Sequence, residues 1–415
     1  MKKVIITISS LLLGIGILLA ASGLQATLLA LRAVDENFNE ATIGLIMSMY
    51  FAGFVAGTFF CPKIIMRVRH IRTFSIMAAV CASTMILIGL WVNPWVWGLM
   101  RFILGICIVG IFMVTESWLN TLANNVNRGR MFGIYVLTNL VFLAGAQFLI
   151  LAGDIRSLDL FAISAALFSI SLVPVAMTRI PEPPRITEIS IDICNIYRIS
   201  ALGFTGSLMS GLLSSIFWSL GPLFARLSGL TDFGIAMFMS ITILGGITML
   251  WPIGHWSDRA DRRMIIMLVS TVSMLISVVA MLVPTDTYYW VAICMFIFGG
   301  MMFSIYPLSV AHTNDHPDAE NRVAVTSNLL LIYGIGAAVG PAIGGFSMSF
   351  FGRYSLFGLF VAGGLFLSLY AWYYMKHGTP ISAEDKTHYA PYLRTSQVAV
   401  ALESHHDGAD TEPGE

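Results

Sequence analysis

The sequence predicts an all-α polytopic membrane protein with twelve transmembrane helices in two six-helix halves. Of its 415 residues, 57% are hydrophobic and only 11% are charged, whereas soluble globular proteins carry about 25% charged residues. A helix that spans a bilayer takes about 20 apolar residues, and the chain contains many runs of that length. This composition excludes an ordinary cytosolic enzyme and a disordered protein. The unbroken runs exclude a transmembrane β-barrel, whose strands alternate over about 10 residues.

Apolar runs between charged or turn-forming residues define the predicted spans. The first run follows Lys2 and Lys3 and has no charge. It is far longer than the roughly 7–15 apolar residues of a signal peptide, so we expect a retained helix. The predicted spans are Val4–Leu31, Ala41–Cys61, Thr73–Val92, Trp95–Leu122, Met131–Gly153, Leu158–Thr178, Ser200–Ala225, Phe233–Trp256, Met264–Val283, Tyr288–His312, Val323–Phe350 and Tyr354–Met375.

The distribution of Lys and Arg along the chain predicts the orientation. If the N-terminus is cytoplasmic, 18 of these residues fall on the inside and 4 on the outside, and Arg101 lies within a span. Cytoplasmic loops of membrane proteins carry an excess of Lys and Arg. We therefore expect both termini in the cytoplasm and the protein in the bacterial inner (plasma) membrane.

The polar stretch 179–199 divides the spans into two sets of six. The predicted parts are an N-terminal half (1–178), a cytoplasmic central loop (179–199), a C-terminal half (200–375) and a disordered cytoplasmic tail (376–415). A shift of 190 residues aligns Gly44 with Gly234 and Gly110 with Gly300, which indicates an internal repeat. Two repeated halves of this kind are typical of transporters whose site lies at the middle of the membrane.

The five cysteines show neither paired nor metal-like spacing, so we predict buried apolar thiols, with no metal site and no cofactor. The tail contains His405 and His406, but two adjacent histidines in a polar segment do not favour a metal site. Nucleic-acid binding is not expected, because the basic residues are those that set topology. The predicted partners are the lipid bilayer and a small-molecule solute, and the predicted state is a monomer.

The loop after the eighth span resembles the G-x-x-x-D-R-x-G-R-R loop of the major facilitator superfamily. Asp261 stands where the family has its second glycine. The resemblance implies a gating loop in which a carboxylate pairs with a neighbouring helix end; topogenic charge in a tight turn is the alternative. The equivalent loop of the first half has no acid at the corresponding position, Met66 or Val68. The predicted gating residues are Gly254, Asp258, Arg259, Arg262 and Arg263.

Other stretches narrow the resemblance. Gly336 to Gly345 is similar to the G-x-x-x-G-P-x-x-G-G element that drug antiporters of this superfamily carry in their fifth span. In this chain the element lies in the eleventh span. Close helix packing through small residues is the favoured interpretation. Val114 to Ser117, Asn127 to Arg130, Trp251 to Gly254 and Tyr306–Pro307 resemble the YcaD-type subgroup. The resemblance covers 4 to 375. It implies a twelve-helix fold in which spans one, four, seven and ten line a central cavity, and it supplies no substrate.

Two charged residues within the fourth span are the leading site candidates. Intramembrane charges are costly and usually functional. Arg101 and Glu116 lie about 60° apart around the helix and about 22 Å apart along it, so they cannot touch. Arg101 could hold an anion, or it could extend outward past Trp91, Trp95 and Trp97. Glu116 could carry a proton, or it could pair with Arg128 or Arg130 near the cytoplasmic edge.

Neutral polar residues extend the candidate site, although each could serve helix packing instead. Ser210, Ser214 and Trp218 follow one stripe of the seventh span, with Ser207. At the 190-residue offset, Tyr306 corresponds to Glu116. The further candidates are Gln25 in the first span and Asn139 and Gln147 in the fifth.

The predicted function is secondary transport of a small organic solute by alternating access, coupled to protons. The chain has no nucleotide-binding P-loop and no catalytic cluster in its spans, which argues against ATP-driven transport and against an enzyme. Uniport or exchange without protons is the alternative within transport. A membrane sensor that keeps the fold but moves nothing is a further alternative.

Overall fold

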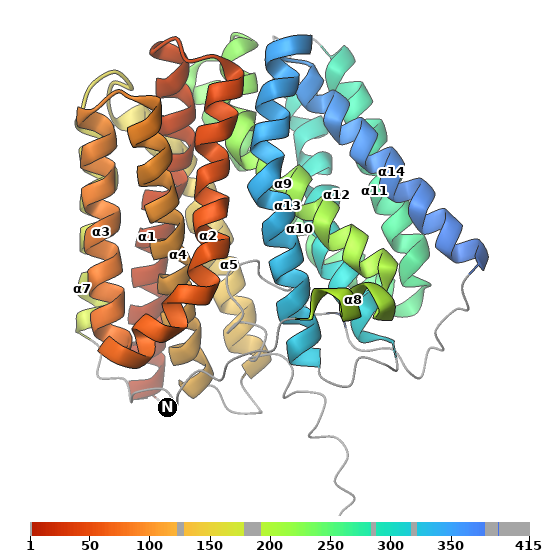
Figure 1. Cartoon of the computed structure of the whole chain (residues 1–415), viewed down its shortest axis with the longest axis horizontal. Coiled ribbons are helices and arrows are strands. Elements are labelled where there is room, and N and C mark those ends of the chain that lie inside the picture. Colours follow the sequence, from red (N-terminus) through yellow and green to blue (C-terminus); the bar gives the residue numbers. More distant parts are fainter. Residues whose placement is uncertain are drawn as a thin grey trace, which may run out of the picture.

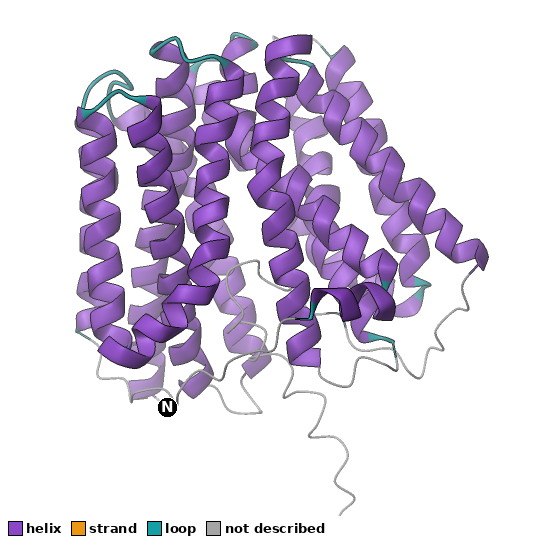
Figure 2. Ribbon diagram, in the orientation of Figure 1, coloured by secondary structure: helices purple, strands orange, loops and turns teal. Residues whose placement is uncertain are grey.

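A bundle of long helices makes up the protein in the computed structural model, which describes residues 2–122, 128–177, 192–283, 288–316, 322–377 and Tyr389. Figures 1 and 2 show the helices running between two faces of the molecule. In the described part of the chain, twelve helical segments are long and apolar enough to cross a membrane. The predicted all-α fold with twelve spans is confirmed.

The first half contains six spans (Figure 1, red to yellow). Their helices are α1 (Lys2–Asp35), α2 (Glu40–Val68), α3 (His70–Leu90), α4 (Pro94–Leu122), α5 (Arg128–Ala146) with the 3₁₀ helix η1 (Gln147–Ala152), and α6 (Asp159–Ile170) with α7 (Leu172–Ala176). The sixth span is interrupted at Ser171, because Pro174 has no N–H to donate to the preceding turn.

The second half contains the other six spans (Figure 1, green to blue). Its helices are α9 (Ala201–Leu227), α10 (Asp232–Arg259), α11 (Arg262–Leu282), α12 (Tyr288–Asn314), α13 (Arg322–Phe351) and α14 (Ser355–His377). The short helix α8 (Ile193–Ile199) precedes them within the predicted central loop, whose residues 179–191 lie outside the described ones. Most of the predicted tail also lies outside, although Lys376 and His377 are helical.

Polar side chains cap the first turns of several helices. Asn39 accepts a hydrogen bond from the amide of Thr42 at the start of α2, Ser200 accepts one from Gly203 at the start of α9, and Thr231 accepts one from Gly234 at the start of α10. These residue types satisfy amide groups that a helix end leaves unbonded. The caps explain why the spans begin where short polar segments interrupt the apolar sequence.

The same helix crossing occurs once in each half. A Cβ atom at Gly53 of α2 would collide with the carbonyl oxygen of Phe102 in α4, and a Cβ at Gly245 of α10 would collide with that of Phe296 in α12. Gly105 and Gly299 make the reciprocal approaches. The equivalent glycines are therefore 192 and 194 residues apart rather than 190. The 190-residue offset inferred from the sequence is therefore too short by two to four residues at this crossing. The alignment of Glu116 with Tyr306 uses that offset, so the crossing does not support it.

The two halves contact each other near the face opposite the N-terminus, which we call the closed face (upper in Figure 1). The amide of Ala342 in α13 donates to Ser48 Oγ in α2 at 2.9 Å, and Ser240 Oγ in α10 donates to the carbonyl oxygen of Ala144 in α5 at 2.8 Å. Gly345 lies directly against Gly44. We call the other side of the molecule the N-terminal face.

The glycine-rich element of the eleventh span forms helix contacts on two sides. Gly340 and Gly344 lie against Leu212 and Leu220 of α9. Gly345, one residue further on, meets the backbone of α2. Small residues allow such close approach, so the packing interpretation of this element is confirmed. It connects α13 to its own half and to the other half.

Candidate functional site

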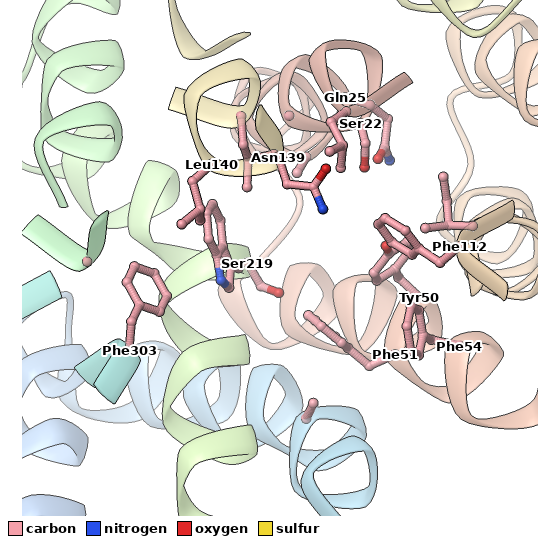
Figure 3. A pocket seen from close by; sticks show the side chains of 18 of the residues that line it. Ser22, Gln25, Tyr50, Phe51, Phe54, Phe112, Asn139, Leu140, Ser219 and Phe303 are labelled. Atoms are coloured by element: carbon pink, nitrogen blue, oxygen red, sulfur yellow. The ribbon is translucent and has the colours of Figure 1, made fainter. Parts of the chain in front are cut away.

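A cavity of about 270 Å³ lies between the halves, roughly halfway along the helices. It is lined by α1, α2, α4, α5 and η1 from the first half and by α9, α10, α12 and α13 from the second. Figure 3 shows Gln25 and Asn139 on one wall and Ser219 and Phe303 on the opposite one. The cavity volume lies just below the roughly 300–1,000 Å³ of pockets for drug-sized ligands. The space therefore suits a small molecule.

Arg101 is buried at the cavity wall, with 3% of its surface exposed. Its Nη1 donates to Gln25 Oε1 of α1 at 3.0 Å, and its guanidinium carbon lies 4.6 Å from the centre of the Tyr50 ring of α2. Three helices of the first half thus meet around one cation. The alternative that Arg101 extends outward past the tryptophans is wrong.

The tryptophans near Arg101 do not form a single belt. Trp91 and Trp95 are exposed, but Trp97 is fully buried. The indole N–H of Trp97 donates to the carbonyl oxygens of Ile88 and Trp91. Trp97 therefore fastens α4 to the end of α3.

The fifth span contributes two amides to the cavity. Gln147 Oε1 accepts a hydrogen bond from Thr27 of α1 at 2.6 Å, and its Nε2 donates to the carbonyl oxygen of Leu143. Asn139 is 5% exposed, and neither atom of its amide has a partner among the described residues. In Figure 3 this amide points toward the space between Gln25, Tyr50 and Ser219. Asn139 is thus available to a solute, whereas Gln147 is already hydrogen-bonded.

The second half supplies an aromatic wall. The ring centres of Trp218 in α9 and Phe303 in α12 lie 5.7 Å apart, and the two ring planes are tilted by 32°. Ser219 is next to Trp218, and its buried hydroxyl has no partner among the described residues. This wall offers a large apolar surface with few polar groups.

The structure brings together some of the predicted site residues and separates others. Those that line the cavity are Gln25, Arg101, Asn139, Gln147 and Trp218. Those that do not are Glu116, Ser210, Ser214 and Tyr306, all fully buried. Small serines at helical spacing follow one side of α9, but only its later turns reach the cavity.

Glu116 lies within the first half, on the N-terminal-face side of Arg101. It is fully buried and accepts a hydrogen bond from the Tyr135 hydroxyl of α5 at 3.0 Å. The predicted pairing with Arg128 or Arg130 involves side chains outside the described ones. Tyr306 packs its ring 5.1 Å from that of Tyr333, and Tyr333 lines the cavity.

The loop Gly254–Arg263 joins helix ends of the second half at the N-terminal face. Arg262 is 2% exposed and forms ion pairs with Asp315, at the end of α12 (2.6 Å), and with Asp258 (3.2 Å). Arg263 pairs with Asp261 at 2.7 Å and donates to the carbonyl oxygen of Tyr374 in α14. The described contacts of the loop therefore connect α10, α11, α12 and α14.

The remaining residues of this loop have different surroundings. Burial alone would raise the pKa of Asp261, but hydrogen bonds and the charge of Arg263 hold it below its usual value. Arg259 is exposed. The amide of Tyr389 in the tail donates to Asp258 at 3.0 Å, and its ring lies against Gly254.

Sequence reasoning missed several residues of these sites. Tyr50, Ser219 and Phe303 line the cavity, but neutral residues in apolar runs give no sign of the direction they face. Asp315 was missed because it lies just beyond the predicted end of the tenth span. Its ion pair with Arg262 depends on how α11 packs against α12.

Comparisons with known proteins agree with this architecture. A family model described as Major Facilitator Superfamily matches residues 11–327 and 203–397. An uncharacterized MFS-type transporter of Enterobacter sp. (strain 638), Ent638_1421, is 29% identical over 335 residues, which are 80% of this chain and 86% of that protein. An uncharacterized MFS-type transporter, YcaD, from Escherichia fergusonii is 27% identical over 334 residues, with the same coverages.

Two solved structures share the fold at low sequence identity. The nucleoside transporter NupG superposes with a TM-score of 0.77 at 15% identity, covering 90% of this chain and 100% of that one. A bacterial homologue of the human lysosomal transporter Spinster gives a TM-score of 0.69 at 17% identity, covering 92% and 97%. At these identities the likeness concerns the fold alone.

Proposed function

The chain belongs to the Major Facilitator Superfamily, and on this premise we propose that it is a secondary transporter that moves a small organic solute by alternating access. It is an integral membrane protein, and its described residues include twelve apolar helices long enough to cross a membrane. Its YcaD-type relatives share most of its length. We propose that it acts as a monomer in the inner membrane.

The observation that carries the proposal is the cavity between the halves. Helices of both halves line it, and unpartnered polar atoms of Gln25, Asn139 and Ser219 belong to its walls. Contacts such as Ser48–Ala342 hold the halves together on one side of it. Rocking the halves about such a site would expose it to one face and then to the other.

We assign the N-terminal face to the cytoplasm, because the spans predicted from the sequence put 18 Lys and Arg residues on the side of the N-terminus and 4 on the other side. The closed face is then periplasmic. The loop Gly254–Arg263 would act in cytoplasmic gating by holding helix ends of the second half together, with Asp315 as a partner of Arg262.

The proposal is tested by uptake into proteoliposomes of a labelled panel of organic acids, neutral nucleosides and sugars, and organic amines. We expect at least one compound to enter faster than into empty liposomes and to exchange against the same unlabelled compound inside. If the whole panel gives only the flux of empty liposomes, transport of a small organic solute is contradicted.

We further propose that the solute is coupled to protons through Glu116. Glu116 accepts a hydrogen bond from the hydroxyl of Tyr135, which belongs to α5. Asn139 lies one turn further along the same helix. Protonation of Glu116 would change its bond to Tyr135, and movement of α5 would reach the cavity through Asn139. A carboxyl group in the membrane interior is the kind of residue that relays protons in transporters.

Glu116→Gln is expected to abolish the dependence of uptake on an imposed pH gradient while exchange without a gradient continues. The amide keeps the shape of the side chain but cannot release a proton. The measurement is uptake of the panel compound with the largest wild-type flux, at equal and unequal internal and external pH. Asp159→Asn, at the exposed start of α6, is the matched control and should retain coupling. Unchanged coupling in Glu116→Gln would contradict this role.

A further inference from the structure

Arg101 is a buried cation with no acidic partner in the described part of the chain. Its side-chain contacts are the amide of Gln25 and the ring of Tyr50. Among the described residues that line the cavity, Arg101 is the one charged residue, with no Asp, Glu, Lys or His beside it. Arginine stays protonated at any working pH. The wall of the cavity thus carries a permanent positive charge that no described acidic residue neutralises.

The unpartnered atoms around this charge are mainly hydrogen-bond donors. Arg101 Nε and Gln25 Nε2 are buried without a partner among the described residues, and so are the amide of Asn139 and the hydroxyl of Ser219. Arg101 Nη1 is already bonded to Gln25 Oε1, which fixes the guanidinium, whereas its Nε has no partner among the described residues. Buried donors without partners are costly. An oxygen-rich anion would satisfy several of them at once.

The two walls of the cavity differ in polarity. The groups named above, apart from Ser219, come from the first half. The second half contributes mainly apolar side chains, among them Trp218, Met239, Leu250 and Phe303. A ligand that satisfies both walls carries its charge at one end and an apolar body at the other.

We propose that the solute is a small organic anion, with an oxyanion head bound by Arg101 and Gln25 and an apolar body packed against Trp218 and Phe303. This inference rests on the proposed transport function, because it names the solute of that same cavity. Charge-assisted hydrogen bonds from a guanidinium to a carboxylate are among the strongest in proteins. A neutral or cationic solute of the same shape would leave Arg101 uncompensated or would repel it.

The test uses three sets of ligands that share a body and differ in the head group: phenylacetate, phenylacetamide and phenethylamine; indole-3-acetate, indole-3-acetamide and tryptamine; hexanoate, hexanamide and hexylamine. The measurement is the thermal unfolding midpoint of the purified full chain with each compound at millimolar concentration, followed by titration for Kd. We expect a carboxylate from at least one set to raise the midpoint more than its amide and amine do. In Arg101→Gln, its Kd should rise about 30-fold or more, with a smaller rise in Arg101→Lys.

A second readout needs no ligand. Because Arg101 is buried without an acid, Arg101→Gln is expected to leave the ligand-free unfolding midpoint equal to or higher than that of the wild type. A residue that only holds α1, α2 and α4 together would lower the midpoint when replaced. A lower ligand-free midpoint, equal stabilisation by amides or amines, or no stabilisation by any carboxylate would each overturn the proposal.

Failure of this inference can be distinguished from failure of the proposed transport function. Uptake of a neutral or cationic panel compound that Arg101→Gln does not alter would leave transport intact and overturn the anion assignment. Carboxylate binding that depends on Arg101, without uptake of any panel compound, would support the anion site and contradict transport.

Discussion

A Ser48→Cys/Ala342→Cys variant is expected to lose transport when its disulfide forms and to regain it on reduction. Ser48 Oγ accepts from the amide of Ala342 across the two halves, so the two backbones are close at the closed face. Alternating access requires that face to open, and a covalent bond between α2 and α13 would prevent it. The background should carry Cys194→Ser, because Cys194 is exposed whereas the other four cysteines are buried.

The measurement is uptake of the panel compound with the largest flux, before and after reductant. The matched control is Thr271→Cys/Ser368→Cys, whose parent hydroxyls lie 2.7 Å apart between α11 and α14 of one half. This second disulfide should leave transport intact. Hydrogen exchange of the amides in α2 and α13 gives a readout that needs no substrate. If the cross-linked protein still transports at the wild-type rate, the closed face does not open during transport.

Asp315→Leu is expected to lower the free energy of unfolding by about 3–5 kcal/mol. The carboxylate of Asp315 is buried and lies 2.6 Å from the equally buried Arg262. Removing it takes one carboxylate away from an arginine that is 2% exposed, whereas Asp258 stays beside that arginine. Desolvated charge without compensation is among the most destabilising features of a protein interior. The measurement is unfolding by denaturant in detergent micelles.

Two further variants test whether the lost stability comes from the uncompensated charge of Arg262 or from a nonspecific disturbance of the structure. The double variant Arg262→Met/Asp315→Leu should recover much of the lost stability, because a buried ion pair can often be replaced by apolar residues. Asp261→Asn keeps the cap of α11 and disturbs a more exposed pair with Arg263, so it should cost about 1 kcal/mol or less. If Asp315→Leu leaves the free energy of unfolding unchanged, the other groups around Arg262, Asp258 among them, compensate its charge without Asp315.

The fold could be predicted largely from the sequence, because span length and Lys/Arg placement are local properties of the chain. The interruptions within the helical spans were harder to predict from the sequence. The fifth span ends in the 3₁₀ turn Gln147–Ala152, and the sixth divides at Ser171, where Pro174 interrupts the hydrogen bonds. Hydrophobicity alone does not distinguish a continuous helix from an interrupted one of the same length.

The candidate site was predicted in part. Arg101 was found because a charge in an apolar run stands out, and Gln25, Asn139 and Gln147 were found as large amides. Tyr50 and Phe303 carry no such signal. Glu116 stands out in the same way as Arg101, yet it lies outside the cavity with Tyr135. The direction a side chain takes depends on the neighbouring helices, which are distant in sequence.

By itself the sequence determined the class of protein, the number of spans and the presence of one arginine and one acid within the fourth span. The class and the number of spans can be predicted because placing polar groups in a bilayer is costly, and each segment must satisfy this constraint through its own composition. Only the tertiary structure decided that Arg101 faces the cavity with Gln25 and Tyr50, and that Arg262 meets Asp315. Such contacts join different helices, whose packing no single segment specifies. At Arg101, the close glycine crossing of α2 and α4 brings the backbone at Tyr50 against α4.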